Sequence, residues 1–206
     1  MNIAIILAGG TGTRVGAGRP KQFIEVLGKP VLAYTCEIFQ DNKRIDAIEI
    51  VCHHDWIDYC NEMVEKYNLK KVKWIVPGGE TFQDSVMNGK NHLEKLVGKE
   101  VSLDDNVYIQ YGGAPFTSQK IVDAVIDMTE ERGSAVTGTP CYQLMTIKND
   151  EDNTRTNTWI DRDKYTQIAC PYGFRFSYLL DVYKRAEEQK LIDKIEPHTT
   201  SLMFAL

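Results

Sequence analysis

The chain reads Leu7-Ala8-Gly9-Gly10-Thr11-Gly12-Thr13-Arg14 directly after a short apolar run, Ile3 to Leu7, and continues to Pro20-Lys21-Gln22. The apolar run predicts a buried strand, so the glycine-rich stretch falls where that strand ends. Glycine lets the backbone approach a ligand closely, and successive N–H groups in such a turn form an anion-binding concavity. Arg14 and Lys21 can balance the charge of a bound polyphosphate. We interpret the stretch as a binding loop for a triphosphate.

Two commoner glycine-rich loops do not fit this stretch. A P-loop has Ser or Thr directly after its lysine, whereas Lys21 is preceded by Pro20 and followed by Gln22. A dinucleotide-binding loop that begins at Gly10 requires glycine or alanine at the position of Val15. The remaining alternative is a flexible surface turn whose basic residues are incidental.

Composition places the chain among ordinary globular proteins. Its 206 residues are 43% hydrophobic and 26% charged, which suits one α/β domain over residues 1–206. The net charge of −5 argues against nucleic acid as a partner, so an anionic substrate has to be captured by local positive charge. No run approaches the roughly 18 apolar residues of a membrane span, so we expect no membrane association.

Cysteine usage and the start of the chain predict a cytoplasmic location. The first residues lack the basic region of a secretory signal and lead straight into the predicted strand. The five cysteines form an odd set without a CxxC pair, which favours reduced thiols over disulfides. The ending Phe204-Ala205-Leu206 has no solvated tail, and we expect the chain to stop short of a natural terminus.

The run His53-His54-Asp55, near Cys52 and Cys60, suggests a metal site at first sight. Adjacent histidines on a strand point to opposite faces, so both are not expected to face one ion. We therefore favour a turn from a strand into a helix, with Asp55 as the helix N-cap.

Apolar runs and helical patterns alternate along the chain. This alternation predicts a single Rossmann-like α/β fold, a doubly wound and mostly parallel sheet with helices on both faces. Glycine pairs at 9–10, 78–79 and 112–113 each follow a strand, and we expect all three at one rim of the sheet, where ligands bind. The expected strands are Ile3–Leu7, Ile48–Cys52, Trp74–Val76 and Val107–Tyr111. Two of the expected helices cover Trp56–Tyr67 and Val86–Val97. Three more begin with Pro30 as first residue, after Ser118 as N-cap, and at Ser177.

Residues 147–158 interrupt the alternation. They read Ile-Lys-Asn-Asp-Glu-Asp-Asn-Thr-Arg-Thr-Asn-Thr, which is too polar to pack in a core. We expect an exposed excursion or a small protruding hairpin arm.

Three motifs, in order along nearly the whole chain, carry a family resemblance. They are the first loop with Pro20-Lys21-Gln22, the run Gly78-Gly79-Glu80-Thr81-Phe82-Gln83-Asp84-Ser85-Val86-Met87-Asn88-Gly89, and Asp161-Arg162 before Pro171–Phe174. With them the chain resembles the cytidylyltransferases typified by 2-C-methyl-D-erythritol 4-phosphate cytidylyltransferase and ribitol-5-phosphate cytidylyltransferase. Their fold is of the nucleotide-diphospho-sugar transferase type. The first loop is shared more widely among nucleotidyltransferases, whereas the spacing in the second is specific to the cytidylyl branch.

The resemblance implies a reaction and roles for residues. A polyol phosphate attacks the α-phosphorus of CTP, which releases pyrophosphate and forms a CDP-alcohol for surface polysaccharide or isoprenoid precursor synthesis. Arg14 and Lys21 clamp the phosphates of CTP and stabilise the charge that develops in the transition state. Arg162 contacts the phosphate of the acceptor, and this arginine is contributed across a homodimer by an arm like residues 141–160. The implied nucleotide-binding residues are Ala8, Gly9, Gly10, Thr11 and Gly12 in the loop, with Gly79, Glu80 and Ser85 at the cytosine and ribose.

The chain departs from the family pattern on the acceptor side. Tyr111 stands where the family has an aspartate that helps hold Mg²⁺, so no metal ligand is assigned and Mg²⁺ is expected to be held largely by the CTP phosphates. Asp104 and Asp105 precede the strand and are not expected to substitute. The other departures are Phe82 and Ala114 in place of arginines, Leu144 in place of a threonine, and Cys170-Pro171-Tyr172 in place of Thr-Pro-Gln.

These departures leave three functions open. The residues expected to contact the nucleotide match the family pattern, whereas those expected to contact the acceptor differ from it. This split favours a cytidylyltransferase with a different polyol phosphate acceptor, such as a glycerol, ribitol or other sugar-alcohol phosphate. The loss of the aspartate also permits a catalytically impaired CTP-binding module. The third possibility is a nucleotidyltransferase that uses another nucleoside triphosphate.

Overall fold

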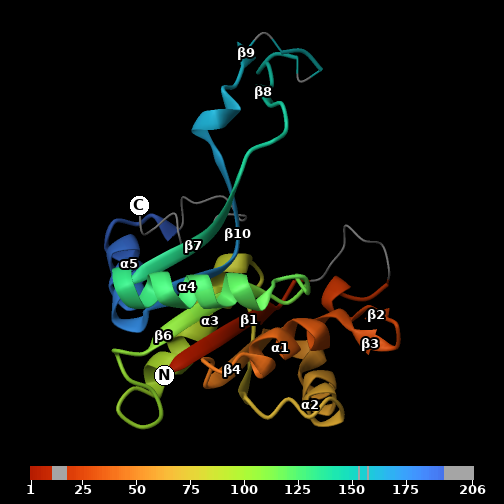
Figure 1. The fold of residues 1–206 in the computed structure, drawn as a ribbon, viewed down its shortest axis with the longest axis vertical. Coiled ribbons are helices and arrows are strands. Elements are labelled where there is room, and N and C mark those ends of the chain that lie inside the picture. Colours follow the sequence, from red (N-terminus) through yellow and green to blue (C-terminus); the bar gives the residue numbers. More distant parts are fainter. Residues whose placement is uncertain (11–17, 153, 157, 193–206) are drawn as a thin grey trace.

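Strand β1 (Asn2–Ala8) lies at the centre of a six-stranded sheet with the order β5-β4-β1-β6-β10-β7 (Figure 1). This computed structural model describes residues 1–10, 18–152, 154–156 and 158–192. The other elements are η2 (Lys21–Phe23), β2 (Glu25–Val26), β3 (Lys29–Pro30), α1 (Val31–Asp41), β4 (Ala47–Cys52), η3 (His54–Trp56), α2 (Ile57–Lys66), β5 (Val72–Pro77), α3 (Phe82–Lys95), β6 (Asn106–Tyr111), α4 (Gln119–Arg132), β7 (Ser134–Pro140), β8 (Thr146–Ile147), β9 (Thr158–Trp159), η4 (Arg162–Lys164), β10 (Thr166–Arg175) and α5 (Phe176–Glu188).

The central strands run in one direction. Strand β1 pairs in parallel with β4 on one side and with β6 on the other, and β4 pairs in parallel with β5. Strand β10 is antiparallel to both β6 and β7. The mostly parallel sheet predicted from the alternation of strands and helices is therefore confirmed, with β10 as the single antiparallel member.

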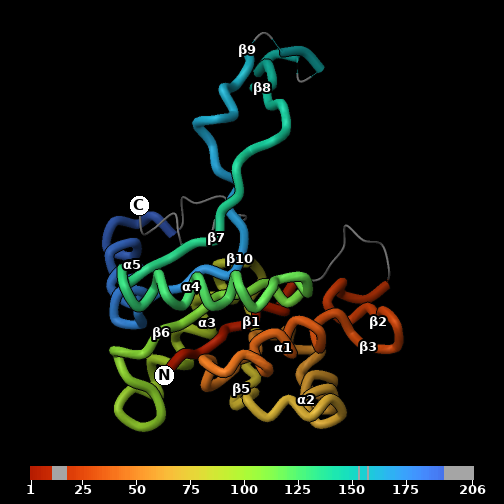
Figure 2. Tube along the Cα trace, viewed as in Figure 1, coloured from red at the N-terminus to blue at the C-terminus, as the bar shows by residue number. Residues whose placement is uncertain are grey.

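Two helical layers bury the two faces of the sheet. Alternate β1 residues point to opposite faces because the side-chain period of a strand is two. Ala4, Ile6 and Ala8 pack in one cluster with apolar residues of α1, α2 and α4. Ile3, Ile5 and Leu7 pack in a second cluster with residues of α3 and α5. Both faces of the sheet are thus covered, and the doubly wound α/β fold is confirmed (Figure 2).

The helix starts correct two expectations and confirm a third. Pro30 is the N-cap of α1 rather than its first residue, because its backbone is extended and pairs with Glu25 in the β2–β3 hairpin. Helix α5 begins at Phe176, one residue before the predicted Ser177, with Arg175 as its N-cap, and the Ser177 N–H donates to the carbonyl of Leu103. Ser118 does cap α4, with its side chain accepting from the N–H of Ile121. The N–H groups at the start of α5 donate to the carbonyls of Gly133, Asp105 and Leu103, which explains why Arg175 needs no side-chain cap.

A long arm leaves the sheet between β7 and β10. The two chain segments project away from the body, and β8 pairs with β9 as an antiparallel hairpin near the tip (Figure 1). The predicted hairpin arm is confirmed. Leu144 and Trp159 on the arm are 91% and 78% exposed, so the arm presents large apolar side chains to its surroundings.

All five cysteines are free and buried, as expected from their number and spacing. In the part of the chain that the structure describes, no helix combines the length and the apolar character needed to cross a bilayer.

Glu49 is a fully buried carboxyl group in the middle of β4. One of its oxygens lies 2.5 Å from Nδ1 of His92 on α3, and the other has no hydrogen-bond partner among the described residues. Burial raises the pKa of Glu49 from 4.5 to about 7, although the contact with His92 lowers it in part. The side chain therefore takes up a proton on folding at mildly acidic pH.

Replacing this carboxyl group should flatten the pH dependence of stability. Between pH 4.5 and about 7 the folded chain binds more protons than the unfolded chain at Glu49, so this residue makes the free energy of unfolding fall as pH rises. The fall is roughly 3 kcal/mol over that window, at about 1.4 kcal/mol per pH unit. Urea unfolding of Glu49→Gln from pH 4.5 to 8 should lack this contribution. Glu62→Gln, an exposed glutamate on α2, should keep the parental slope. Equal slopes in all three proteins would contradict the assignment.

Candidate functional site: the glycine-rich rim

Three glycine pairs meet at the carboxyl edge of the sheet, as the sequence predicts. The Gly78 N–H donates to the carbonyl of Cys52 at 2.7 Å, and the Gly112 N–H donates to the carbonyl of Leu7 at 2.8 Å. A Cβ atom added to Gly78 would lie 3.3 Å from Cα of Gly9. The turns that follow β1, β5 and β6 are therefore in contact, and they form a rim built largely of backbone.

Ser85 lies between two of these turns. Its Oγ accepts a hydrogen bond from the Gly79 N–H at 3.2 Å and donates to the carbonyl of Thr81 at 3.1 Å. A Cβ atom on Gly9 would come within 2.8 Å of the same oxygen, so the first loop approaches Ser85 without a side chain between them. The serine is only 4% exposed: its two hydrogen bonds stay within the turn after β5, and the loop after β1 packs directly against its hydroxyl.

Helix α3 begins at this rim with a capping box. The Thr81 side chain accepts from the Asp84 N–H at 3.1 Å, and the Asp84 carboxylate accepts from the Thr81 N–H at 2.9 Å. A Cβ atom on Gly79 would lie 2.1 Å from Cβ of Asp84, so only glycine fits there. Glu80 is exposed in the same turn. The positive end of a helix of 14 residues thus faces the rim, which favours an anionic ligand.

Lys21 brings positive charge to the rim. Its ammonium-bearing side chain lies across Gly113, where an added Cβ atom would be 3.0 Å from Cε of the lysine. Lys21 is exposed and has no ion-pair partner among the described residues, so its charge is available to a ligand. The packing of Lys21 on Gly113 also explains why the third turn carries glycine.

Gln22 is a structural part of the loop that sequence reasoning did not assign. Its amide nitrogen donates to the carbonyls of Ala8 and Gly10, both at 2.7 Å, and the side chain is 2% exposed. One buried amide therefore fixes both ends of the Gly9–Gly10 turn. A glutamine in a basic segment gives no sequence signal for this role, because only the fold brings it under the loop.

The structure unites most of the predicted site residues. Ala8, Gly9, Gly10, Lys21, Gly79 and Ser85 line the rim or hold it together, with Glu80 in the turn beside them. Thr11, Gly12 and Arg14 lie outside the described residues. Arg162 is not brought to the rim of its own chain: it opens η4, between β9 and β10, and its guanidinium donates to the carbonyl of Tyr142 on the arm at 2.6 Å.

The far side of the rim is aromatic. Tyr111, the last residue of β6, packs edge-to-face against Phe82 at 5.4 Å and against Tyr172 at 6.3 Å between ring centroids. Burial raises the pKa of Tyr111, so its phenol stays neutral near pH 7. Asp105 lies at the opposite end of β6, where it accepts from the Ser102 N–H at 2.8 Å, and cannot replace a carboxylate at the Tyr111 position.

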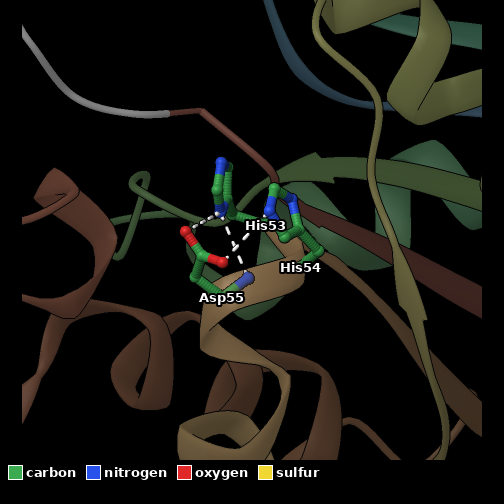
Figure 3. A group of neighbouring side chains, drawn as sticks. All are labelled: His53, His54 and Asp55. Atoms are coloured by element: carbon green, nitrogen blue, oxygen red, sulfur yellow. Dashed lines mark hydrogen bonds and ion pairs between the residues drawn. The ribbon is translucent and has the colours of Figure 1, made fainter.

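The predicted turn from a strand into a helix at His53-His54-Asp55 is confirmed, but the predicted cap is wrong. Asp55 is not an N-cap: the cap of the short helix η3 is His53, whose side chain accepts from the Asp55 N–H at 3.3 Å. The two histidines do not point apart, because β4 ends at Cys52 and the chain turns before His54. Their rings stack with centroids 4.3 Å apart (Figure 3).

A rim of this kind can bind and position a polyphosphate. It offers the N-terminus of α3 and the ammonium of Lys21, which has no ion-pair partner among the described residues, and these stabilise negative charge without transferring a proton. It is therefore suited to chemistry at phosphorus, where positioning and charge neutralisation supply most of the rate enhancement.

Comparison with known proteins agrees with this geometry. The family model described as IspD, 2-C-methyl-D-erythritol 4-phosphate cytidylyltransferase, matches residues 2–196. The chain is 37% identical over 206 residues to a ribitol-5-phosphate cytidylyltransferase of Streptococcus agalactiae serotype V, covering 99% of this chain and 83% of the relative. It is 38% identical over 193 residues to the 2-C-methyl-D-erythritol 4-phosphate cytidylyltransferase of Clostridium acetobutylicum, covering 93% and 80%.

A solved structure shares the whole architecture. The crystal structure of 4-diphosphocytidyl-2C-methyl-D-erythritol synthase from Anaerococcus prevotii superposes with a TM-score of 0.76 at 24% identity, covering 99% of this chain and 82% of that one. At that identity the likeness establishes the fold alone. Family-model coverage of almost the entire chain and relatives well above 30% identity confirm the resemblance seen in the motifs. This chain thus belongs to the 2-C-methyl-D-erythritol 4-phosphate cytidylyltransferase family.

Proposed function

We propose that this chain is a cytidylyltransferase that joins CMP from CTP to a polyol phosphate and releases pyrophosphate. The observation that carries the proposal is the convergence of the three glycine turns, Lys21 and the α3 N-terminus at one rim. Relatives named for ribitol 5-phosphate and for 2-C-methyl-D-erythritol 4-phosphate support this class of acceptor. The CDP-alcohol would serve surface polysaccharide or isoprenoid precursor synthesis.

The nucleotide side of the reaction rests on the first loop and the turn before α3. The phosphates of CTP lie over Ala8, Gly9, Gly10, Thr11 and Gly12, close to Lys21, and Arg14 adds a second cation. Gly79, Glu80 and Ser85 meet the cytosine and ribose. Ser85 is already engaged by Gly79 and Thr81, so it acts mainly by shaping the turn that receives the base.

The transfer itself needs no protein nucleophile. An oxygen of the acceptor phosphate attacks the α-phosphorus of CTP and forms a new P–O bond, while the bond from that phosphorus to the pyrophosphate oxygen breaks. Pyrophosphate leaves with the electron pair of the broken bond. The ammonium of Lys21 neutralises the charge that builds up on the phosphoryl oxygens in the transition state.

The acceptor side is aromatic and depends on a second copy of the chain. Phe82 and Tyr111 form an uncharged wall where the family pattern has charged residues. We propose that the arm, residues 141–160, docks on a partner in a homodimer and that Arg162 reaches the partner's acceptor phosphate. The exposed Leu144 and Trp159 support docking of the arm, because large apolar side chains favour a covered surface.

Mg²⁺ is expected to accompany CTP rather than to occupy a protein site at β6. The neutral phenol of Tyr111 does not fit a hard cation, which prefers carboxylate oxygens, so the described residues do not form a Mg²⁺ site there. We propose that the CTP phosphates hold the ion, and that the protein works in the cytoplasm, where CTP is available.

A panel of acceptors tests the function. The purified full chain is incubated with CTP, Mg²⁺ and, separately, ribitol 5-phosphate, 2-C-methyl-D-erythritol 4-phosphate and glycerol 3-phosphate, and pyrophosphate release is followed. At least one acceptor should give stoichiometric pyrophosphate and a CDP-alcohol. UTP, ATP and GTP in place of CTP should give little product.

The same panel separates the competing functions. The position of Tyr111 favours one alternative, a CTP-binding module without catalysis. In that case CTP would raise the melting temperature while every acceptor stayed silent. Stronger stabilisation by UTP or GTP than by CTP would instead indicate a nucleotidyltransferase with another base preference.

A further inference from the structure

A group of potential metal ligands lies at the same edge of the sheet as the proposed nucleotide site but outside that site. His53, His54 and Asp55 follow directly after Cys52, the last residue of β4, whose carbonyl accepts from the Gly78 N–H. Among the described residues this is the one group of three His, Cys, Asp or Glu side chains that could hold a metal ion. None of the three has a role in the proposed transfer reaction.

The geometry of the group is that of a ligand set gathered around one point. Nε2 of His54 lies 3.0 Å from one Asp55 oxygen, and Nδ1 of His53 lies 3.7 Å from the other. One ligand atom from each of the three residues falls within 4.8 Å of the others. Figure 3 shows the two rings lying one over the other beside the carboxylate.

The local backbone explains why three consecutive residues converge. A strand would send the histidines to opposite faces, but β4 has ended and the 3₁₀ turn η3 begins at His54. The Asp55 N–H donates to Nδ1 of His53 and holds that ring over the turn. At 3.3 Å this bond is long, and a metal ion on Nδ1 would replace it because both use the same lone pair.

We propose that His53, His54 and Asp55 bind a divalent metal ion of borderline softness, for which Zn²⁺ is the probe. Two imidazoles and one carboxylate suit Zn²⁺, Co²⁺ and Ni²⁺, whereas Mg²⁺ prefers oxygen ligands alone. His54 and Asp55 are 72% and 68% exposed, so an ion can reach them from solution and their side chains are free to adjust. Three protein ligands leave at least one coordination position for water or an anion.

Titration of the full chain with Zn²⁺ and Co²⁺ tests the site. Isothermal titration calorimetry of the nucleotide-free protein should give saturable binding of one ion per chain, and bound Co²⁺ should gain visible absorption. His54→Ala and Asp55→Asn should each weaken binding by at least about tenfold, because loss of even an outer-shell partner costs 10- to 100-fold. A large excess of Mg²⁺ should not displace the ion.

Two further variants separate binding from folding. Asp58→Asn removes an exposed carboxylate from the next turn and should bind Zn²⁺ like the parent. His53→Asn keeps a residue that can cap the turn, so its metal-free melting temperature should match the parent's while Zn²⁺ affinity falls. Absence of saturable binding to the parent, or equal affinity in His54→Ala and the parent, would overturn the proposal. Both results are independent of pyrophosphate release and so of the proposed function.

Discussion

Replacing Lys21 with alanine is expected to lower the rate of pyrophosphate release by about 100- to 1,000-fold, the range seen when one preorganised charge-stabilising group is removed. The ammonium is exposed at the rim, has no ion-pair partner among the described residues, and lies against Gly113 in the third turn. No other described lysine occupies that place. The loss should fall mainly on kcat, because the charge on the phosphoryl oxygens is largest in the transition state.

Steady-state kinetics with the best acceptor would measure this loss, and CTP titration followed by melting temperature would report binding separately. Lys99→Ala is the matched control, because Lys99 is an exposed lysine in the turn after α3 whose side chain has no hydrogen-bond or ion-pair partner among the described residues. It should keep the parental rate. If Lys21→Ala kept more than about a tenth of the parental kcat, Lys21 would not stabilise the transition state, and Arg14 would become the main candidate.

Gly79→Ala is expected to disrupt the turn that opens α3, at a cost of about 1–3 kcal/mol in the free energy of unfolding. The new methyl carbon would lie 2.1 Å from Cβ of Asp84 and 3.1 Å from its carbonyl carbon, so backbone must move to relieve the contact. That movement separates Thr81 from Asp84 and breaks the capping box. CTP affinity should fall as well, because the N–H groups of the turn and the helix N-terminus shift together.

Gly10→Ala is a useful comparison for stability. A methyl group there meets none of the described residues within 4 Å, so urea unfolding should give a free energy within about 0.5 kcal/mol of the parent. Parental stability and CTP affinity in Gly79→Ala would instead mean that the turn yields to a side chain at little cost. In that case the glycine would not be required by close packing.

The fold was accessible from the sequence because its signals are local. Alternating apolar and helical patterns identified the four parallel strands β1, β4, β5 and β6, and the glycine pairs placed the site at the carboxyl ends of these strands. Those signals depend on side-chain period and backbone freedom, which neighbouring residues decide. Local patterns were weaker at element starts. Pro30 takes its extended conformation from its pairing with Glu25. The start of α5 after Arg175 is fixed by backbone hydrogen bonds to Leu103 and Asp105, which are distant in the chain.

Other features depended on contacts between residues far apart in the chain. Gln22 under Ala8, and Glu49 against His92, are polar side chains whose partners the sequence does not indicate. The turn after β4, which ends at Cys52 as predicted, is a further case. Its cap is the His53 ring, which accepts from the Asp55 N–H, and the two histidine rings stack instead of pointing to opposite faces.

The sequence by itself determined the chemistry of the rim: glycines that allow close approach, Lys21 and Arg14 for charge, and the motif order that places the chain in its family. The tertiary structure decided what those residues do for one another. It put Ser85 between two turns, laid Lys21 across Gly113 and sent Arg162 out on the arm. The physical reason is that residue type sets which interactions a group can make, whereas packing of distant segments sets which of them it makes.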